Sequence, residues 1–362
     1  MKITDVAVEI LEVPLAEGYQ AGGRAVDANW HVLARLRTAD GIEGIGYVVK
    51  QRGDLVRAIA AAAGELAQHL VGMDVFEPEA AWTKLAKLSD WVGPGGLQHW
   101  ALAPLDIALW DAAGKAAGQP LHRLLGGFRN SLPAYASDRL WYSLGLDDLA
   151  ESARMHAAAG YRAIKLRLGA SPDAAMQCAR VRAAAEGAGA GVAVMVDATQ
   201  SWDYPTAARL GPALEEAGIA WLEDPLYHDD VAGLAALADR LDVPVTGGEN
   251  LYTLAQFRQS FEARALDIPI LDLFRVGGIT PWRKIAALAQ SYRLPVCGHV
   301  VPEVHVHLLA AVPNGHMVEY MPRSAEILTN MPAPSGGVLR PAPGPGHGLQ
   351  LDERSVARCR AS

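Results

Sequence analysis

Residues 192–249 contain three apolar runs, VAVMVD (192–197), IAWLED (219–224) and VPVTGGE (243–249), and each run carries an acid at or near its end. Successive acids, at positions 197, 223 and 249, are 26 residues apart, about one strand plus one helix. In a repeating strand–helix barrel this spacing brings side chains of neighbouring strand ends to one open mouth. Three converging carboxylates repel each other unless a cation lies between them. Oxygen-only ligands favour a hard ion, so the sequence predicts Mg²⁺ bound by Asp197, Glu223 and Glu249.

Further apolar runs extend this pattern on both sides. Alanine-rich, helix-like segments separate most of the strand candidates, which lie at 132–137, 163–168, 192–198, 220–225, 243–249, 270–276, 295–300 and 317–321. Eight strand-then-helix units favour a closed parallel barrel over an open doubly wound sheet. The first candidate, LPAYAS, is not followed by the glycine fingerprint of a dinucleotide-binding sheet. The predicted fold class is therefore α/β, a modified (β/α)8 TIM-type barrel.

The N-terminal third has a different pattern. Residues 2–14 and 31–49 alternate like strands, with a hairpin turn near Asp40-Gly41, and 54–125 is mainly helical. Between the strands, GYQAGGRAVDAN (18–29) is typical of a mobile loop that covers a site. We therefore expect an α+β capping domain at 1–125, a barrel at 126–325, and a Pro- and Gly-rich segment at 326–362 that returns to the cap.

Composition argues against several kinds of partner. The chain of 362 residues has a net charge of −8 and no basic run, which argues against nucleic acid. Its apolar stretches are too short and interrupted to span a membrane, and the N-terminus lacks the apolar core of a signal peptide. Cys178, Cys297 and Cys359 are few and far apart, which indicates a reducing compartment. We expect a cytoplasmic protein that acts on a small molecule.

Polar residues at the other predicted strand ends add catalytic groups. Lys165 and Arg167 are two apart, so on a strand they point to the same side, and beside three carboxylates they suggest a bridging anionic substrate. His299 suits a general base, and Asp272, one strand over, would fix its tautomer. Glu319, if protonated, would donate a further hydrogen bond. This set suits removal of the weakly acidic proton next to a carboxylate.

Simpler interpretations apply to each residue alone. A single acid at a strand end is more often a helix cap or a surface group, but equal spacing of three acids with a histidine downstream disfavours that interpretation. Lys165 could cap the barrel rim. From the predicted flap, the candidates for substrate binding are Tyr19, Arg24 and Trp30, although Trp30 starts a strand and could equally belong to the core.

These motifs together resemble the enolase superfamily, its mandelate racemase/muconate lactonizing enzyme-like branch, and specifically the mandelate racemase subgroup. The resemblance covers nearly the whole chain. The matching motifs are KLR (165–167), MVDATQSWD (195–203), WLEDP (221–225), GGEN (247–250), ILDLFRVGGIT (270–280), CGHVVPEVH (297–305) and MVEY (317–320). Each motif alone is a weak signal, but seven in the family's order form a strong one.

The resemblance implies a capping domain over a modified barrel, one essential Mg²⁺ and a symmetric homo-oligomer. It implies that Asp197, Glu223 and Glu249 bind the metal. It also implies that His299 and Asp272 form a catalytic dyad facing the strand with Lys165 and Arg167, and that Glu319 is the electrophilic acid.

Two departures from the family pattern narrow the expected reaction. Arg167 stands where the racemase type has a second lysine, and an arginine stays protonated and makes a poor base. This disfavours two-base racemisation and favours a lyase, an aldonate or aldarate dehydratase, in which His299 alone removes the α-proton. Alternatives are a racemase or epimerase, a lactone cycloisomerase, or a catalytically silent barrel. Thr199, where the family usually has Asn, puts a neighbouring polar contact in doubt.

Overall fold

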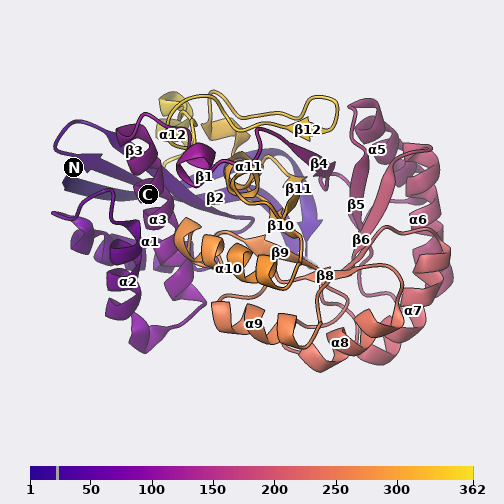
Figure 1. Cartoon of the computed structure of the whole chain (residues 1–362). Coiled ribbons are helices and arrows are strands. Elements are labelled where there is room, and N and C mark those ends of the chain that lie inside the picture. The colour runs from indigo at the N-terminus through magenta and orange to yellow at the C-terminus, as the bar shows by residue number, and fades with distance from the viewer. Residues whose placement is uncertain (22–23, 362) are drawn as a thin grey trace.

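The computed structural model describes residues 1–21 and 24–361, and its chain forms a cap beside a barrel (Figure 1). The cap contains a three-stranded antiparallel sheet in the order β1-β2-β3 with helices packed on it. Its elements are β1 (Ile3–Ala21), β2 (Arg24–Thr38), β3 (Glu43–Lys50), α1 (Val56–Ala67), α2 (Pro78–Leu88), α3 (Leu97–Ala116) and α4 (Leu121–Leu124). The predicted hairpin is confirmed, as is the mainly helical character of residues 54–125.

The barrel contains all eight predicted strands. Each strand from β4 to β11 pairs in parallel with its neighbour, and β11 pairs with β4 to close the barrel. Strands and helices alternate as β4 (Leu132–Ala136), α5 (Leu146–Ala158), β5 (Ala163–Arg167), α6 (Ala174–Ala188), β6 (Ala193–Asp197), α7 (Tyr204–Glu216), β7 (Leu222–Glu223), α8 (Val231–Arg240), β8 (Val245–Gly247), α9 (Leu254–Glu262), β9 (Ile268–Asp272), α10 (Ile279–Ser291), β10 (Val296–His299), α11 (Pro302–Ala311) and β11 (Gly315–Tyr320). This arrangement confirms the predicted fold class.

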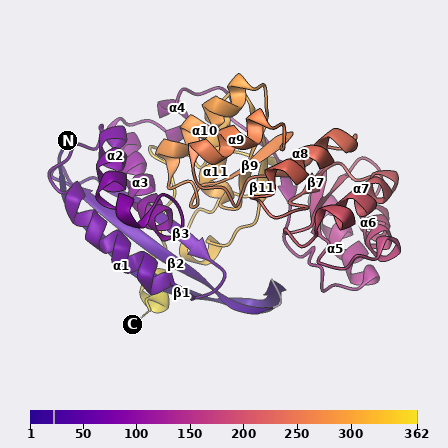
Figure 2. The ribbon, with the colours of Figure 1, turned by 90° about the horizontal axis from the view of Figure 1, so that it is seen from below.

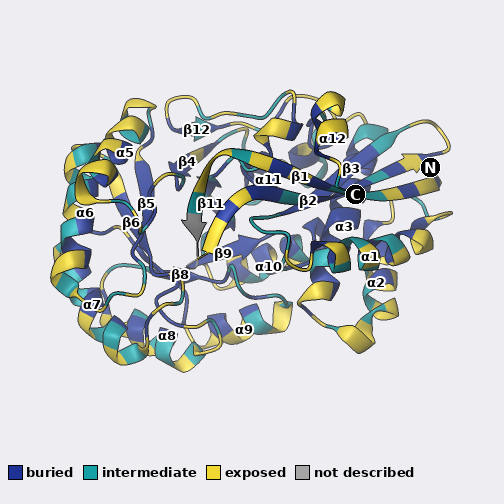
Figure 3. Cartoon of the chain, turned by 180° about the vertical axis from the view of Figure 1, so that it is seen from behind, coloured by how far each residue is buried: buried dark blue, intermediate teal, exposed yellow. Residues whose placement is uncertain are grey.

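Burial follows the barrel geometry. The strands are buried, whereas the helices around them expose their outer faces (Figure 3). Aliphatic residues of strands and helices form one continuous core, in which Val196, Leu222 and Leu271 are fully buried. No helix within the described ranges combines the length and apolar character needed to cross a bilayer.

The C-terminal residues contact both parts of the chain. β12 (Val338–Leu339) pairs antiparallel with β4. α12 (Glu353–Cys359) lies against the cap, where Arg360 Nη2 is 2.7 Å from Glu9 Oε2 and the Ala361 amide donates to the Ile10 carbonyl. The domain boundaries near residues 125 and 325 remain a proposal.

The segment 18–29, predicted as a loop, is mostly strand. Tyr19 pairs with Val26 and Ala21 with Arg24, so β1 and β2 continue as a two-stranded ribbon that runs toward the barrel (Figure 2). The alternation of exposed and buried residues along β2, with Val26 and Ala28 buried, is the period of a half-buried strand. Gly22 and Gly23, part of the predicted flap, lie outside the described residues.

The predicted strand at 270–276 is shifted. β9 ends at Asp272, because the amides of Phe274 and Arg275 donate to Asp272 Oδ1 at 2.7 and 2.8 Å and turn the chain. The same turn holds the Asp272 carboxylate in place at the strand end.

Two glycines of β3 allow helix α3 to pack directly on the cap sheet. A Cβ at Gly46 would lie 2.3 Å from the carbonyl oxygen of Pro104, and one at Gly44 would lie 2.2 Å from that of Ala108. Both contacts are with helix backbone, which cannot move away without displacing α3. The cap therefore depends on the absence of side chains at these positions.

We expect Gly46→Ala to lower the free energy of unfolding by about 1–3 kcal/mol, because the added methyl group overpacks the α3 contact. Gly64→Ala is the matched control, since Gly64 lies in helix α1 with open space around its Cβ position. That control should be neutral or slightly stabilising. Urea unfolding midpoints of the two variants test this, and equal midpoints would contradict the packing account.

Candidate active site

A cavity of about 670 Å³ lies where the barrel strands end and the cap approaches them. Barrel residues on its wall include Arg167, Asp197, Glu249, Asp272 and His299, each at or just after the C-terminal end of its strand. In parallel barrels this end carries the catalytic groups. Five of the predicted site residues therefore share one cavity.

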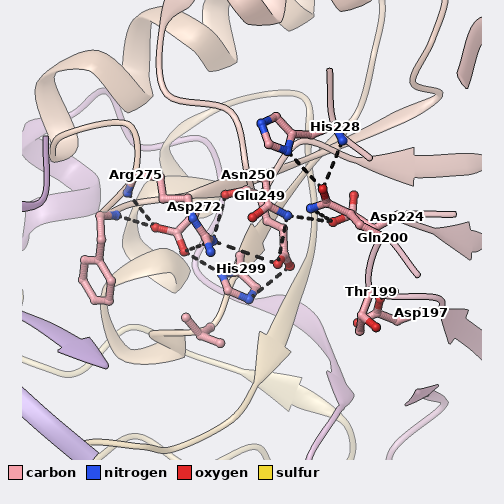
Figure 4. Close-up of polar contacts among 12 residues, drawn as sticks. Asp197, Thr199, Gln200, Asp224, His228, Glu249, Asn250, Asp272, Arg275 and His299 are labelled. Carbon is pink, nitrogen blue, oxygen red and sulfur yellow. Dashed lines mark hydrogen bonds and ion pairs between the residues drawn. The ribbon is translucent and has the colours of Figure 1, made fainter. Parts of the chain in front are cut away.

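His299 and Asp272 form the predicted dyad. They are directly opposite each other in the pairing of β10 with β9, and His299 Nδ1 lies 2.6 Å from Asp272 Oδ2 (Figure 4). Burial alone would raise the pKa of Asp272, but the hydrogen bond with His299 and the charge of Arg275 lower it to about 2. The ionised carboxylate accepts a hydrogen from Nδ1, so Nε2 is the nitrogen that can take a proton.

Arg275 lies beside the dyad and was not singled out from the sequence. Its Nη1 donates to the carbonyl oxygen of Glu249 at 3.0 Å and lies 3.3 Å from Asp272 Oδ2. The only signal for it was its position three residues after Asp272 in ILDLFRV, which becomes informative once β9 is known to turn there. Arg275 therefore ties the ends of β8 and β9 together.

Lys165 lies in a layer that does not reach the cavity wall. Its Nζ is 2.6 Å from Glu223 Oε1 and 3.0 Å from Glu319 Oε1, and all three side chains are fully buried. Burial would lower the pKa of Lys165, but Glu223 and Glu319 raise it above its usual value. Lys165 is therefore an ammonium group fixed between two carboxylates. Among the described residues of β5, Arg167 is the one whose positive charge lies on the cavity wall.

Arg167 is held rigidly. Its Nη1 donates to the carbonyl oxygen of Ser137 at 2.8 Å, its Nε lies 3.7 Å from Asp197 Oδ2, and its guanidinium lies over the ring of Trp141 at 4.4 Å. Burial opposes its charge, but Asp197 raises its pKa above the usual arginine value. A guanidinium in this setting orients a substrate oxygen and does not accept a proton.

Glu319 differs from the expected protonated acid. Although burial would raise its pKa, the charges of Lys165, His299 and Arg167 lower it below its usual value. Its Oε2 accepts a hydrogen bond from the Val300 amide at 2.8 Å. The lysine beside it therefore favours the ionised carboxylate, which acts as an acceptor toward the Val300 amide.

The three predicted metal ligands lie on adjacent strands. Asp197 is directly opposite Glu223 in the pairing of β6 with β7, and Glu249 follows β8. Among the described residues, however, no three His, Cys, Asp or Glu side chains converge closely enough to form a ready-made metal cage. Glu223 points to Lys165, and Glu249 Oε2 lies 3.1 Å from His299 Nε2.

The residues present fit a hard divalent cation by their chemistry. All three offer only carboxylate oxygens, and Glu223 Oε2 is buried without a hydrogen-bond partner in the described chain. Burial raises the pKa values of Asp197 and Glu223, and the neighbouring carboxylates add to this shift. A bound cation would give the unpaired Glu223 oxygen a partner and would offset the repulsion between the carboxylates.

A hydrogen-bonded set behind the carboxylates was also missed. The amide nitrogens of Gln200 and Asn250 lie 3.3 and 3.0 Å from Asp224 Oδ2, and the His228 amide donates to Gln200 Oε1 (Figure 4). Thr199, Gln200 and Asp224 adopt positive φ angles of 51°, 58° and 42°. These contacts hold the loops after β6, β7 and β8 together, and the strained backbone is typical of functional sites.

The three candidates from the predicted flap do not line the cavity within the described chain. Tyr19 comes nearest, because its ring stacks on the wall residue Trp141 at 4.4 Å. Arg24 is largely exposed and lies 3.6 Å from Asp54, and the Trp30 ring packs against Gly53. All three residues belong to the paired strands β1 and β2, not to a loop.

Comparison with known proteins identifies the family. Residues 4–126 match the mandelate racemase/muconate lactonizing enzyme N-terminal domain, and residues 148–355 match the enolase C-terminal domain-like family. The chain belongs to the mandelate racemase/muconate lactonizing enzyme family of the enolase superfamily. The resemblance seen in the sequence motifs is thereby confirmed.

Several relatives in this family are named as enzymes of sugar acids or their derivatives. The L-talarate/galactarate dehydratase of Salmonella typhimurium is 37% identical over 78% of this chain and 70% of its own length. The 3,6-anhydro-alpha-L-galactonate cycloisomerase of Streptomyces coelicolor is 32% identical over 90% of both chains. The crystal structure of L-talarate dehydratase from Polaromonas sp. JS666, complexed with Mg and L-glucarate, has a TM-score of 0.92 and 33% identity over 100% of this chain and 98% of that one.

We expect His299→Asn to reduce turnover about 10²–10⁴-fold while leaving metal binding intact, because it removes the proton acceptor but no carboxylate. Exchange of the substrate α-proton with deuterated water, followed by NMR, measures the step directly. His316→Asn is the matched control, since His316 is exposed and outside the cavity wall. Retained exchange in His299→Asn would remove His299 from the role of base.

Proposed function

We propose that this chain is a Mg²⁺-dependent acid-sugar dehydratase that acts on an aldonate or aldarate. The observation that carries the proposal is the asymmetry of the cavity. It offers one competent base, His299 fixed by Asp272 at 2.6 Å, whereas the β5 side presents Arg167, a permanent cation. One base is enough for elimination of water, but racemisation through two bases needs a second one.

His299, Asp272 and Arg167 have different roles in the proposed reaction. His299 Nε2 takes the α-proton, and the protonated imidazole then donates that proton to the β-hydroxyl, which leaves as water. The enol that remains tautomerises to a 2-keto-3-deoxy acid. Asp272 holds the imidazole tautomer throughout, and Arg167 orients a substrate oxygen through its fixed guanidinium.

Asp197, Glu223 and Glu249 would hold Mg²⁺, which when bound supplies Lewis-acid stabilisation of negative charge on the substrate carboxylate. The ammonium of Lys165 adds positive charge behind this site, and its position between Glu223 and Glu319 keeps it there. Arg275 neutralises part of the charge of Glu249 and Asp272. These fixed charges lower the cost of the anionic intermediate.

A second candidate is cycloisomerisation through the same proton abstraction. The relative from Streptomyces coelicolor, named a cycloisomerase and 32% identical over 90% of both chains, favours it. The two reactions differ after the α-proton is removed, because cycloisomerisation expels a ring oxygen and releases no water. NMR of the products distinguishes them.

We further propose that the chain is cytoplasmic and forms a symmetric homo-oligomer. Cys178, Cys297 and Cys359 are free and buried, which suits a reducing compartment. Oligomerisation is proposed from family membership alone.

We expect Mg²⁺-loaded protein to convert at least one hexonate or hexarate to a 2-keto-3-deoxy acid, detected as its semicarbazone by ultraviolet absorbance. The panel should include the aldarates galactarate, L-talarate and D-glucarate and the aldonates D-galactonate and D-gluconate. If protein that binds Mg²⁺ formed no 2-keto-3-deoxy acid from any member of the panel, the dehydratase assignment would be contradicted.

Removal of the metal with a chelator should abolish turnover, and added Mg²⁺ should restore it, because the carboxylate cluster needs a divalent cation. Binding should also raise the unfolding temperature of the protein without substrate, since a ligand that binds only the folded state stabilises it. Asp197→Asn should weaken this thermal shift. An unfolding temperature independent of Mg²⁺ would argue against the proposed site.

A further inference from the structure

The two walls of the cavity differ in their charges. The barrel wall carries carboxylates and two arginines, Arg167 and Arg275, that lie within about 4 Å of those carboxylates. The wall also contains Lys50 at the end of β3, Arg52 two residues later, and Arg323, three residues after β11. No acidic residue of the described chain belongs to this second group on the wall. Asp54, which is off the wall, lies beside Lys50 and Arg52, so among the described residues of this group only Arg323 forms no ion pair.

Arg323 has the clearest unmet bonding capacity. It forms no ion pair within the described chain, and its Nε is buried without a hydrogen-bond partner there. By contrast, Arg275 donates to Glu249 and Asp272, and Arg167 donates to Ser137. A buried guanidinium N–H without an acceptor is costly unless a ligand supplies one.

The backbone on both sides of Arg323 is fixed. Its amide donates to the Met321 carbonyl at 2.9 Å, and its carbonyl accepts from Asn29 Nδ2 at 3.1 Å. The next residue, Ser324, lies with its hydroxyl 3.2 Å from His31 Nε2, and both are buried. Residues of strand β2 therefore hold the backbone of Arg323 beside the cavity, so little backbone order remains to be gained on binding.

Arg323 and Arg167 also lie near one aromatic pair. The rings of Tyr19 and Trp141 stack at 4.4 Å, and the Arg167 guanidinium lies over Trp141. Burial raises the pKa of the Tyr19 phenol, and the charges of Arg323 and Arg167 act against that rise. Arg167 and Arg323 therefore both line the cavity and both lie near the Tyr19–Trp141 pair.

We propose that Arg323, assisted by Lys50, binds a second carboxylate at the far end of the substrate, so that this chain prefers an aldaric diacid to an aldonic monoacid. The inference rests on the proposed function and names its substrate class. A carboxylate matches the planar donors of a guanidinium. The terminal hydroxymethyl group of an aldonate would leave the Arg323 guanidinium without its counter-charge.

Calorimetric titration tests this, with Mg²⁺-loaded His299→Asn protein as the non-reacting receptor. The ligand pairs are galactarate with D-galactonate and D-glucarate with D-gluconate, because each pair differs only at C6. Each aldarate should bind roughly 10- to 100-fold more tightly than its aldonate, the size of one charge-assisted contact. Adding Arg323→Gln should remove most of that preference and leave aldonate affinity unchanged, while Arg323→Lys should retain part of it.

Arg340→Gln is the matched control, since Arg340 is exposed and outside the cavity wall, and it should change neither affinity. Equal affinity for both members of each pair, or equal weakening of both by Arg323→Gln at unchanged unfolding temperature, would overturn the subsite but not the dehydratase function. Tighter binding of 6-phospho-D-gluconate than of D-glucarate would overturn the assignment to a carboxylate. Binding of none of these acids would contradict the function and the subsite together.

Discussion

The balance of charge at the barrel mouth is the constraint on which this structure depends. Asp197, Glu223, Glu249, Asp272 and Glu319 lie within one small region, and the fixed cations Lys165, Arg167 and Arg275 do not equal them in number. Lys165 compensates the deepest pair, and Arg275 compensates the dyad. What remains is a negative surplus beside an unpaired oxygen of Glu223. A divalent cation would complete the balance.

The parallel barrel explains how distant residues reach this region. Strands β5 to β11 each place one or two polar groups at or near the C-terminal end, and direct pairing of Asp197 with Glu223 and of His299 with Asp272 fixes their order around the mouth. Turn hydrogen bonds, such as those from the Phe274 and Arg275 amides to Asp272, then set the side-chain directions. The cap closes the cavity with residues from β3 and is itself held by the direct contact of α3 with Gly44 and Gly46.

Sequence alone predicted much of this because strand periodicity and acid spacing are local signals. The eight strands, the hairpin of the cap and the pairing of His299 with Asp272 all follow from such signals. Side-chain environment is not local. The ribbon of β1 and β2, the ionised state of Glu319 beside Lys165, and the removal of Lys165 from the cavity wall depend on contacts between distant segments. For the same reason Arg323 carried no signal until the structure placed it on the wall.

The most direct test of the central claim is anomalous diffraction from crystals soaked with Mn²⁺, which replaces Mg²⁺ at oxygen sites and is visible in difference maps. We predict one strong peak within bonding distance of carboxylate oxygens from Asp197, Glu223 and Glu249, on the cavity side opposite His299. A mouth without such a peak, or a metal bound elsewhere while those three side chains keep their contacts with Lys165, Arg167 and His299, would contradict the account.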